Sequence, residues 1–263
     1  MEAYKDMFPF KLGTTSYILP VKEDNLLTNI RFLRDRFDLI QLLFMGREYL
    51  HEIMSPSIIK DLKAIRDESR VSFTVHLPAD LDLLNSSEDK INASINVIEH
   101  IMAETGPLNI EGYVLHVDRF VEGSARADLD QREYHNFRTT LDSISMRMGG
   151  EAKNIYIENT TYDLVYFKDI LLASPFPICM DAGHLFFFGQ DYDTFINAFS
   201  SRIRQIHLHG YRDGKDHKAI TELEGSALHK IIEFQVKYSC PMILEVFNLD
   251  DLVQSAEYLK SFY

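Results

Sequence analysis

The sequence has 263 residues, of which 46% are hydrophobic, so it is long enough for one large domain with a substantial core. Its formal net charge of −13 argues against a broad basic surface for nucleic acid, and we expect a small-molecule partner. The N-terminus lacks the pattern of a secretory signal, and no apolar run approaches the length that spans a membrane. We therefore expect a cytoplasmic protein, with its oligomeric state left open.

Strand-like and helix-like segments alternate along the chain. After a lead-in of ten residues, strands are expected at 11–17, 37–44, 71–77, 112–117, 154–158, 176–180, 203–208 and 241–247. Helices are expected at 25–36, from 55 onward, and at 87–104, 129–148, 163–172, 192–200 and 222–238, with a closing helix from 250. Strands that are nearly continuous in apolar character and alternate with helices are typical of a parallel sheet covered by helices.

This alternation predicts an α/β protein with a single (β/α)8 TIM barrel over residues 1–263. No glycine-rich dinucleotide fingerprint follows the first strand, where Gly13 stands alone, so an open Rossmann-type sheet is not favoured. Cys179 and Cys240 lie in apolar segments and are predicted to be buried free thiols. In a barrel of this kind the active site lies at the carboxyl ends of the strands.

Six consecutive predicted strands end in side chains that can bind a metal ion. These are His76, His116, Glu158, Asp181 with His184, His207 with Asp216 and His217 in the following loop, and Glu245. A lone histidine in a strand is more often a hydrogen-bonded core residue. A carboxylate such as Glu158 or Glu245 at the end of an apolar strand is costly unless it is paired or bound to metal. The repetition of such residues at one end of the barrel therefore favours a metal site. Asp181 and His184 are expected where a buried strand ends and a loop begins.

Imidazole and carboxylate donors without cysteine favour zinc, manganese or iron(II), and the donors are too many for one ion. We therefore expect two or three divalent ions and favour zinc. Clustered ions suit hydrolysis of a phosphodiester, because one generates hydroxide while another stabilises the leaving oxygen. We assign catalytic roles to Glu158, Asp181, His207 and Glu245. Substrate or phosphate contacts are expected from Arg119, Asn159, His209, Arg212 and Lys215, with the cationic side chains in loops at the same mouth.

Four strand-end segments carry a family resemblance. The segments 156–160, 181–184, 207–209 and 244–245 resemble the successive strand ends of the AP-endonuclease-family-2, xylose-isomerase-like barrels, over nearly the whole chain. In the endonuclease branch the resemblance implies a trinuclear zinc site with the ligands His76, His116, Glu158, Asp181, His184, His207, His217 and Glu245. Asp216 would be a ninth ligand, but it directly precedes His217, whereas the endonuclease pattern has one residue between the two.

A narrower resemblance involves the segments 9–20, 73–78 with 80–83, and 207–210 leading to Asp216 and His217. These are similar to the cobamide-remodelling phosphodiesterases. The resemblance implies hydrolysis in the nucleotide loop of a cobamide, with release of a cobinamide-type product. That branch places an acid at the tip of the second strand, where this chain has Met45, with Glu48 the nearest acid.

Three other functions remain open from the sequence. A sugar or sugar-phosphate isomerase or epimerase would need only Glu158, Asp181, His207 and Glu245 around one ion, which leaves His76, His116 and His217 without a role. An AP-endonuclease-like repair nuclease would use the same donors, but the chain is acidic and has no obvious basic, aromatic-rich insertions for a duplex. A corrinoid- or sugar-binding protein without catalysis would not need the complete donor set.

Overall fold

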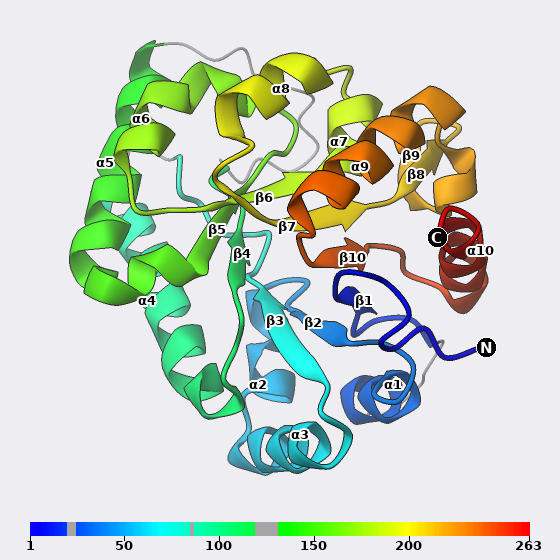
Figure 1. Cartoon of the computed structure of the whole chain (residues 1–263). Helices are drawn as coiled ribbons and strands as arrows, with labels where there is room; N and C mark the ends of the chain where they lie inside the picture. Colours follow the sequence, from blue (N-terminus) through cyan, green and yellow to red (C-terminus); the bar gives the residue numbers. More distant parts are fainter. Residues whose placement is uncertain (20–24, 85–86, 119–130) are drawn as a thin grey trace.

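Parallel strands pair with one another all the way round and close into a barrel (Figure 1). The computed structural model describes residues 1–19, 25–84, 87–118 and 131–263. The barrel strands are β1 (Leu12–Thr15), β2 (Leu39–Leu43), β3 (Ser72–His76), β4 (Tyr113–Leu115), β5 (Ile155–Glu158), β6 (Ile178–Asp181), β7 (Ile203–Leu208) and β10 (Met242–Leu244). Strand β10 pairs in parallel with both β7 and β1, which closes the ring and confirms the predicted (β/α)8 TIM barrel.

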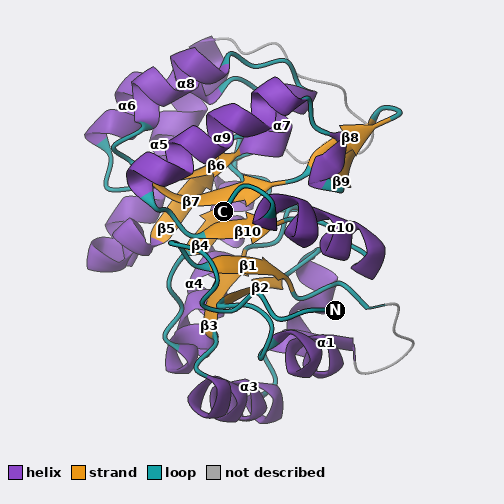
Figure 2. Ribbon diagram, turned by 45° about the vertical axis from the view of Figure 1, so that its right-hand side comes forward, coloured by secondary structure: helices purple, strands orange, loops and turns teal. Residues whose placement is uncertain are grey.

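Helices surround the barrel and cover the outer face of the strands (Figures 1 and 2). They are α1 (Asn25–Leu33), α2 (Leu50–Ile53), α3 (Pro56–Ser69), α4 (Glu88–Thr105), α5 (Gln131–Met148), α6 (Lys168–Ala173), α7 (Ala182–Phe187), α8 (Tyr192–Phe199), α9 (Gly225–Tyr238) and α10 (Leu249–Lys260). Their starts follow local capping chemistry. Ser55 accepts a hydrogen bond from the backbone of Ile58 before Pro56 begins α3, and Asn248 caps α10 in the same way.

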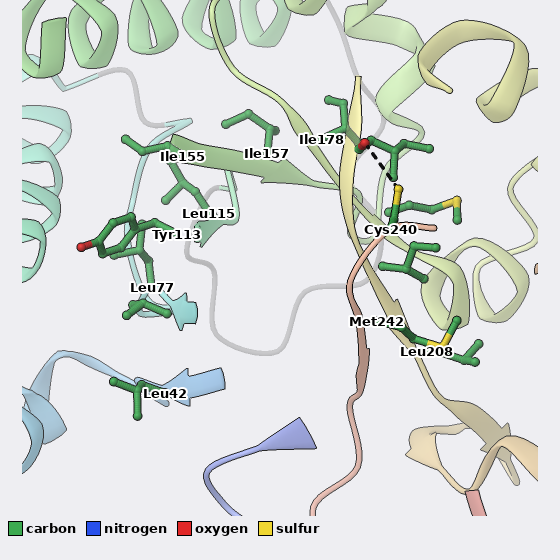
Figure 3. Packing of buried hydrophobic residues seen from close by; sticks show 14 of the residues in the cluster. Leu42, Leu77, Tyr113, Leu115, Ile155, Ile157, Ile178, Leu208, Cys240 and Met242 are labelled. Carbon is green, nitrogen blue, oxygen red and sulfur yellow. Dashed lines mark hydrogen bonds between the residues drawn. The ribbon is translucent and has the colours of Figure 1, made fainter. Parts of the chain in front are cut away.

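The main core lies between the strands and the helices. Leu42, Leu115, Ile157 and Leu208 are completely buried on different strands and belong to one hydrophobic cluster (Figure 3). The facing helices contribute apolar stripes, such as Ile59, Leu62 and Ile65 of α3. Burial of this apolar surface stabilises the barrel and leaves the strand ends free to carry polar groups.

Several predicted elements differ from the structure in extent. Strand β1 ends at Thr15, not at residue 17, and the hydroxyl groups of Thr14 and Thr15 donate to the backbone oxygens of Leu244 and Val246. The expected helix at 163–172 is a 3-10 turn, Leu164–Phe167, followed by α6. The expected helix at 129–148 is α5 from Gln131, and residues 129–130 lie outside the described part.

Two segments that were expected to be loops are regular structure. Helix α7 begins directly after β6, because Asp181 Oδ1 accepts a hydrogen bond from the backbone N–H of His184 at 2.7 Å and caps the helix. After β7, the strands β8 (Gly210–Arg212) and β9 (Lys215–Lys218) form an antiparallel hairpin. Its turn has Asp213 and Gly214 at positive φ, which suits a two-residue hairpin. The prediction of loops here was therefore wrong.

Cys179 and Cys240 are both buried and free, which confirms that prediction. The Cys240 thiol lies 3.7 Å from the backbone oxygen of Ile203, a contact drawn in Figure 3. Within the described ranges, no helix is both long and apolar enough to cross a membrane.

Candidate metal centre

Histidine and carboxylate side chains meet at the carboxyl ends of the barrel strands. They come from β3, the end of β4, β5, β6, the start of α7, β7, β9 and the end of β10. The hairpin β8–β9 and helix α7 lie beside each other at this end (Figure 2). Parallel strands bring their carboxyl ends to one rim, so residues far apart in the sequence become neighbours. Within the described residues, the donors form four groups, three of which share Glu158, and the ligand atoms of each group lie within 4.8 Å of one another.

The first group consists of His76, His116 and Glu158. Glu158 Oε2 lies 2.9 Å from His116 Nε2 and 3.3 Å from His76 Nε2. His76 Nδ1 lies 2.8 Å from the backbone oxygen of Leu77, which can accept a hydrogen bond from Nδ1–H and leave Nε2 free as a ligand.

The second group consists of Glu158, Asp181, His207 and Glu245, all of which are buried. His207 Nδ1 lies 2.7 Å from Glu158 Oε1 and 3.0 Å from Glu245 Oε2. Glu158 therefore belongs to both groups, with one oxygen facing each. The four residues assigned a catalytic role from the sequence are those that the structure brings together here.

The third group consists of His184, His209 and His217. His209 Nε2 lies 3.3 Å from Asp181 Oδ1, so the third group adjoins the second. The carboxylate of Asp216 lies 3.6 Å from His184 Nε2 and 3.8 Å from His217 Nε2, close enough to supply a further oxygen. The sequence suggested His209 as a substrate contact, whereas the structure places it among possible metal ligands.

Cys179 also lies beside Glu158 and His207 and forms a further group with them. Burial raises the pKa of its thiol to about 12. The thiol therefore stays protonated at neutral pH and is a poor ligand compared with the adjacent imidazole and carboxylates.

Unsatisfied polar atoms show that the donor set fits a bound cation. Among the residues that the structure describes, Asp181 Oδ2, His184 Nδ1 and His209 Nε2 are buried and have no hydrogen-bond partner. Asp181 Oδ2 and His184 Nδ1 are only 3.0 Å apart but do not have hydrogen-bond alignment. Buried polar atoms normally have partners, and a divalent ion would provide one to each of these donors.

Opposite charges in the cluster shift the pKa values of its members. Burial opposes ionisation of Glu158, but His207 and His116 outweigh it and hold its pKa well below the usual value. The pKa of Glu245 falls to about 2, because His207 similarly outweighs burial. Burial alone would lower the pKa of His184, yet the carboxylate of Asp181 raises it well above 6.5. Without metal, the carboxylates are thus charged and balanced partly by protonated imidazole.

Residues 33–262 match the family model of the xylose isomerase-like TIM barrels. The chain belongs to this family. Its barrel resembles the solved structure of a D-tagatose 3-epimerase-like protein, with 22% identity, a TM-score of 0.72 and 96% of each chain covered. The IolI protein with a bound zinc atom shares 15% identity with a TM-score of 0.70, covering 95% of this chain and 94% of that one.

Endonuclease IV from Thermus thermophilus shares 14% identity with a TM-score of 0.67, covering 95% of this chain and 99% of that one. No curated protein matches the chain in sequence. At these identities the solved structures establish a shared fold, and the family includes both epimerases and endonucleases.

The other side chains that the sequence predicted to contact substrate or phosphate have other partners or positions in this xylose isomerase-like barrel. Both ends of the Asn159 amide hydrogen-bond the backbone of Asp181, at 2.8 Å each, so its side chain orients β6. Arg212 bonds Glu222 at 2.7 Å and is largely exposed. It lies on β8, and the exposed Lys215 lies on β9, so neither is in a loop. Arg119 falls outside the described residues.

Sequence reasoning missed two buried glutamines beneath the cluster. The amide nitrogens of Gln41 and Gln205 each lie 2.9 Å from His207 Nε2. The available signal was the single polar residue of the strand LIQLL; in IRQIHL the glutamine stands between Arg204 and His207 and is a weaker signal. A buried amide in an apolar strand needs a polar partner, so this pattern indicates an internal contact.

Proposed function

We propose that the chain is a metal-dependent phosphodiesterase that hydrolyses the nucleotide loop of cobamides and releases a cobinamide-type product. The observation that carries the proposal is the surplus of donors around Glu158. One group of four donors is enough for one ion, yet two further groups adjoin it, one sharing Glu158 and one touching Asp181. A phosphodiesterase that uses two or three ions has a role for all of them.

The proposed reaction is a hydrolysis at phosphorus. The oxygen of water bonds to phosphorus, the bond from phosphorus to one ester oxygen breaks, and the departing alkoxide takes a proton. Bound divalent cations would stabilise the negative charge on the phosphodiester and promote ionisation of water. Glu158 would bridge two cations, and Asn159 would hold the backbone of Asp181 so that its carboxylate faces the cluster.

The substrate class in the proposal comes from the resemblance of the opening segment and of the segments around His76 and His207 to the cobamide-remodelling branch. The mouth has features that support a large, partly apolar substrate. Tyr17 follows β1 with 47% of its surface exposed, and Met45 follows β2 with 48% exposed. We expect these side chains to contact the corrin, with Met45 replacing the acid of that branch.

A sugar isomerase or epimerase is the second candidate. The second donor group is sufficient for this function, because it can hold one ion between buried carboxylates suited to proton transfer. Its members are Glu158, Asp181, His207 and Glu245. Epimerases of the same fold are among the similar solved structures. This candidate would leave His76, His116 and His217 unused, and a metal content of one ion per chain would favour it.

The deciding experiment is hydrolysis of cobalamin by purified protein loaded with zinc, manganese or iron(II). We expect a cobinamide-type product, identified by chromatography and mass spectrometry, with oxygen from ¹⁸O-labelled water in the phosphate-bearing product. Glu158→Gln, loaded in the same way, should be inactive. Unchanged cobalamin with every metal would overturn the proposal. Parallel incubations with ketohexoses and with a duplex that contains an abasic site test the epimerase and the repair nuclease.

A further inference from the structure

Two buried glutamines contact the side of His207 that faces away from the carboxylates. Gln41 comes from β2 and Gln205 from β7, and both side chains are almost completely inaccessible. His207 Nδ1 faces Glu158 and Glu245, whereas its Nε2 lies 2.9 Å from each glutamine amide. Both ring nitrogens of this histidine therefore have polar partners.

The position of the ring proton decides what His207 can bind. A neutral imidazole has one nitrogen that donates and one that accepts. If Nδ1 binds a cation beside Glu158 and Glu245, the proton must be on Nε2, which then needs an acceptor. A glutamine can provide one, because turning its amide by 180° exchanges the oxygen and the nitrogen without changing its shape.

Gln41 has a free acceptor for this purpose. With its nitrogen toward His207, Gln41 Oε1 is buried and has no hydrogen-bond partner in the described part of the chain. Gln190 and Gln235 also have such an oxygen, but their amide nitrogens donate to backbone oxygens, which fixes their orientation. The Gln41 amide instead faces a ring nitrogen, and no carbonyl of the described residues fixes its orientation. Exchanging its two ends places the oxygen against His207 Nε2.

We infer that Gln41 is a positioning residue for a metal ion: its amide oxygen accepts a hydrogen bond from His207 Nε2–H and so presents Nδ1 to a cation in the second group. Partners of this kind fix the tautomer and the ring orientation of a metal-binding histidine. The inference goes beyond the proposed function, because it concerns the metal position that either a phosphodiesterase or an epimerase would use.

The test compares zinc affinities of purified full-length variants by competition with a chromophoric chelator. Gln41→Met keeps the shape but removes the acceptor, and we expect about 10- to 100-fold weaker binding of one ion per chain. Gln41→Glu restores an acceptor and should bind that ion more tightly than Gln41→Met. Gln235→Met is the matched control, since it removes another fully buried glutamine from α9, and its zinc affinity should equal that of the wild type.

A second readout follows the proton itself. In ¹⁵N-labelled, zinc-loaded protein, NMR should show His207 with a protonated Nε2 and a metal-bound Nδ1. The inference is overturned if Nε2 is the metal-bound atom, if Gln41→Met keeps wild-type affinity, or if Gln41→Met and Gln41→Glu lose affinity equally. Neither readout uses a substrate, so failure to hydrolyse cobalamin would contradict the proposed function without affecting this inference.

Discussion

Glu158 Oε1 lies 2.7 Å from His207 Nδ1, and both side chains are completely buried. The second oxygen of the same carboxylate faces the other way, toward His116 and His76. One side chain thus connects the first two donor groups, and cations bound in them would share it. A carboxylate can bridge in this way because each oxygen can bind a separate cation, whereas an amide has only one acceptor oxygen.

The first prediction is that Glu158→Gln removes this bridge. We expect loss of at least one ion per chain and a fall in turnover of more than about 100-fold, because changes that only touch a ligand's partner already cost about 10- to 100-fold. Metal content by elemental analysis and turnover of cobalamin would check it. Glu151→Gln, at an exposed glutamate outside the cluster, is the control. Wild-type metal content in Glu158→Gln would contradict the bridging role.

The second prediction concerns removal of metal. A ligand present at about 100 times its dissociation constant stabilises the folded state by about 2.7 kcal/mol per site. For a chain of this size one occupied site corresponds to about 5 to 10 °C, so we expect a chelator to lower the melting temperature by at least that much, and added zinc to restore it. Scanning calorimetry with and without chelator measures the shift. The double variant that combines His207→Ala with Glu245→Ala should show a smaller change in melting temperature on adding chelator than the wild type. A change as large as that of the wild type would mean that the stabilising ion binds elsewhere.

The rim of donors could be predicted from sequence because all strands of a parallel barrel point in the same direction. Each apolar run that ended in an acid or an imidazole therefore added a residue to the same place, as for His76, Glu158 and Glu245. The fold followed from the same regularity, since eight apolar strands alternating with helices leave few other architectures.

Contacts that depend on the length and direction of a side chain could not be predicted from the order of strands and helices. The amide of Asn159 was available in principle to a substrate, but it bonds the backbone of Asp181 on the neighbouring strand. His209 follows β7 in sequence, and its place beside His184 depends on the start of α7. The hairpin has no apolar alternation in β9, where Lys215–Lys218 is polar throughout, so only Asp213 and Gly214 indicated a turn.

The third prediction is that metal binding releases protons at pH 7. The raised pKa of His184 means that its imidazole is protonated at this pH in the metal-free protein, and a ligand must be neutral. Metal affinity should therefore rise with pH until it passes that pKa. Calorimetry in buffers of different ionisation enthalpy measures the number of protons released.

A matched pair of variants identifies the source of these protons. His184→Ala should release fewer protons than the wild type. His229→Ala, at an exposed histidine of α9 outside the donor groups, is the control and should release as many protons as the wild type. An observed binding enthalpy that does not depend on the buffer would rule out proton release.

The fourth prediction tests the third donor group through Gly183. A Cβ at this position would overlap the ring of His209, which is completely buried and cannot move freely. Gly183→Ala should therefore displace His209, destabilise the fold by about 1–3 kcal/mol and lower the zinc content by one ion per chain. Gly225→Ala is the control, because a Cβ there has no neighbour within 4 Å. Denaturant unfolding and elemental analysis measure the two effects separately, and unchanged zinc content in a destabilised Gly183→Ala protein would show that His209 is not a ligand.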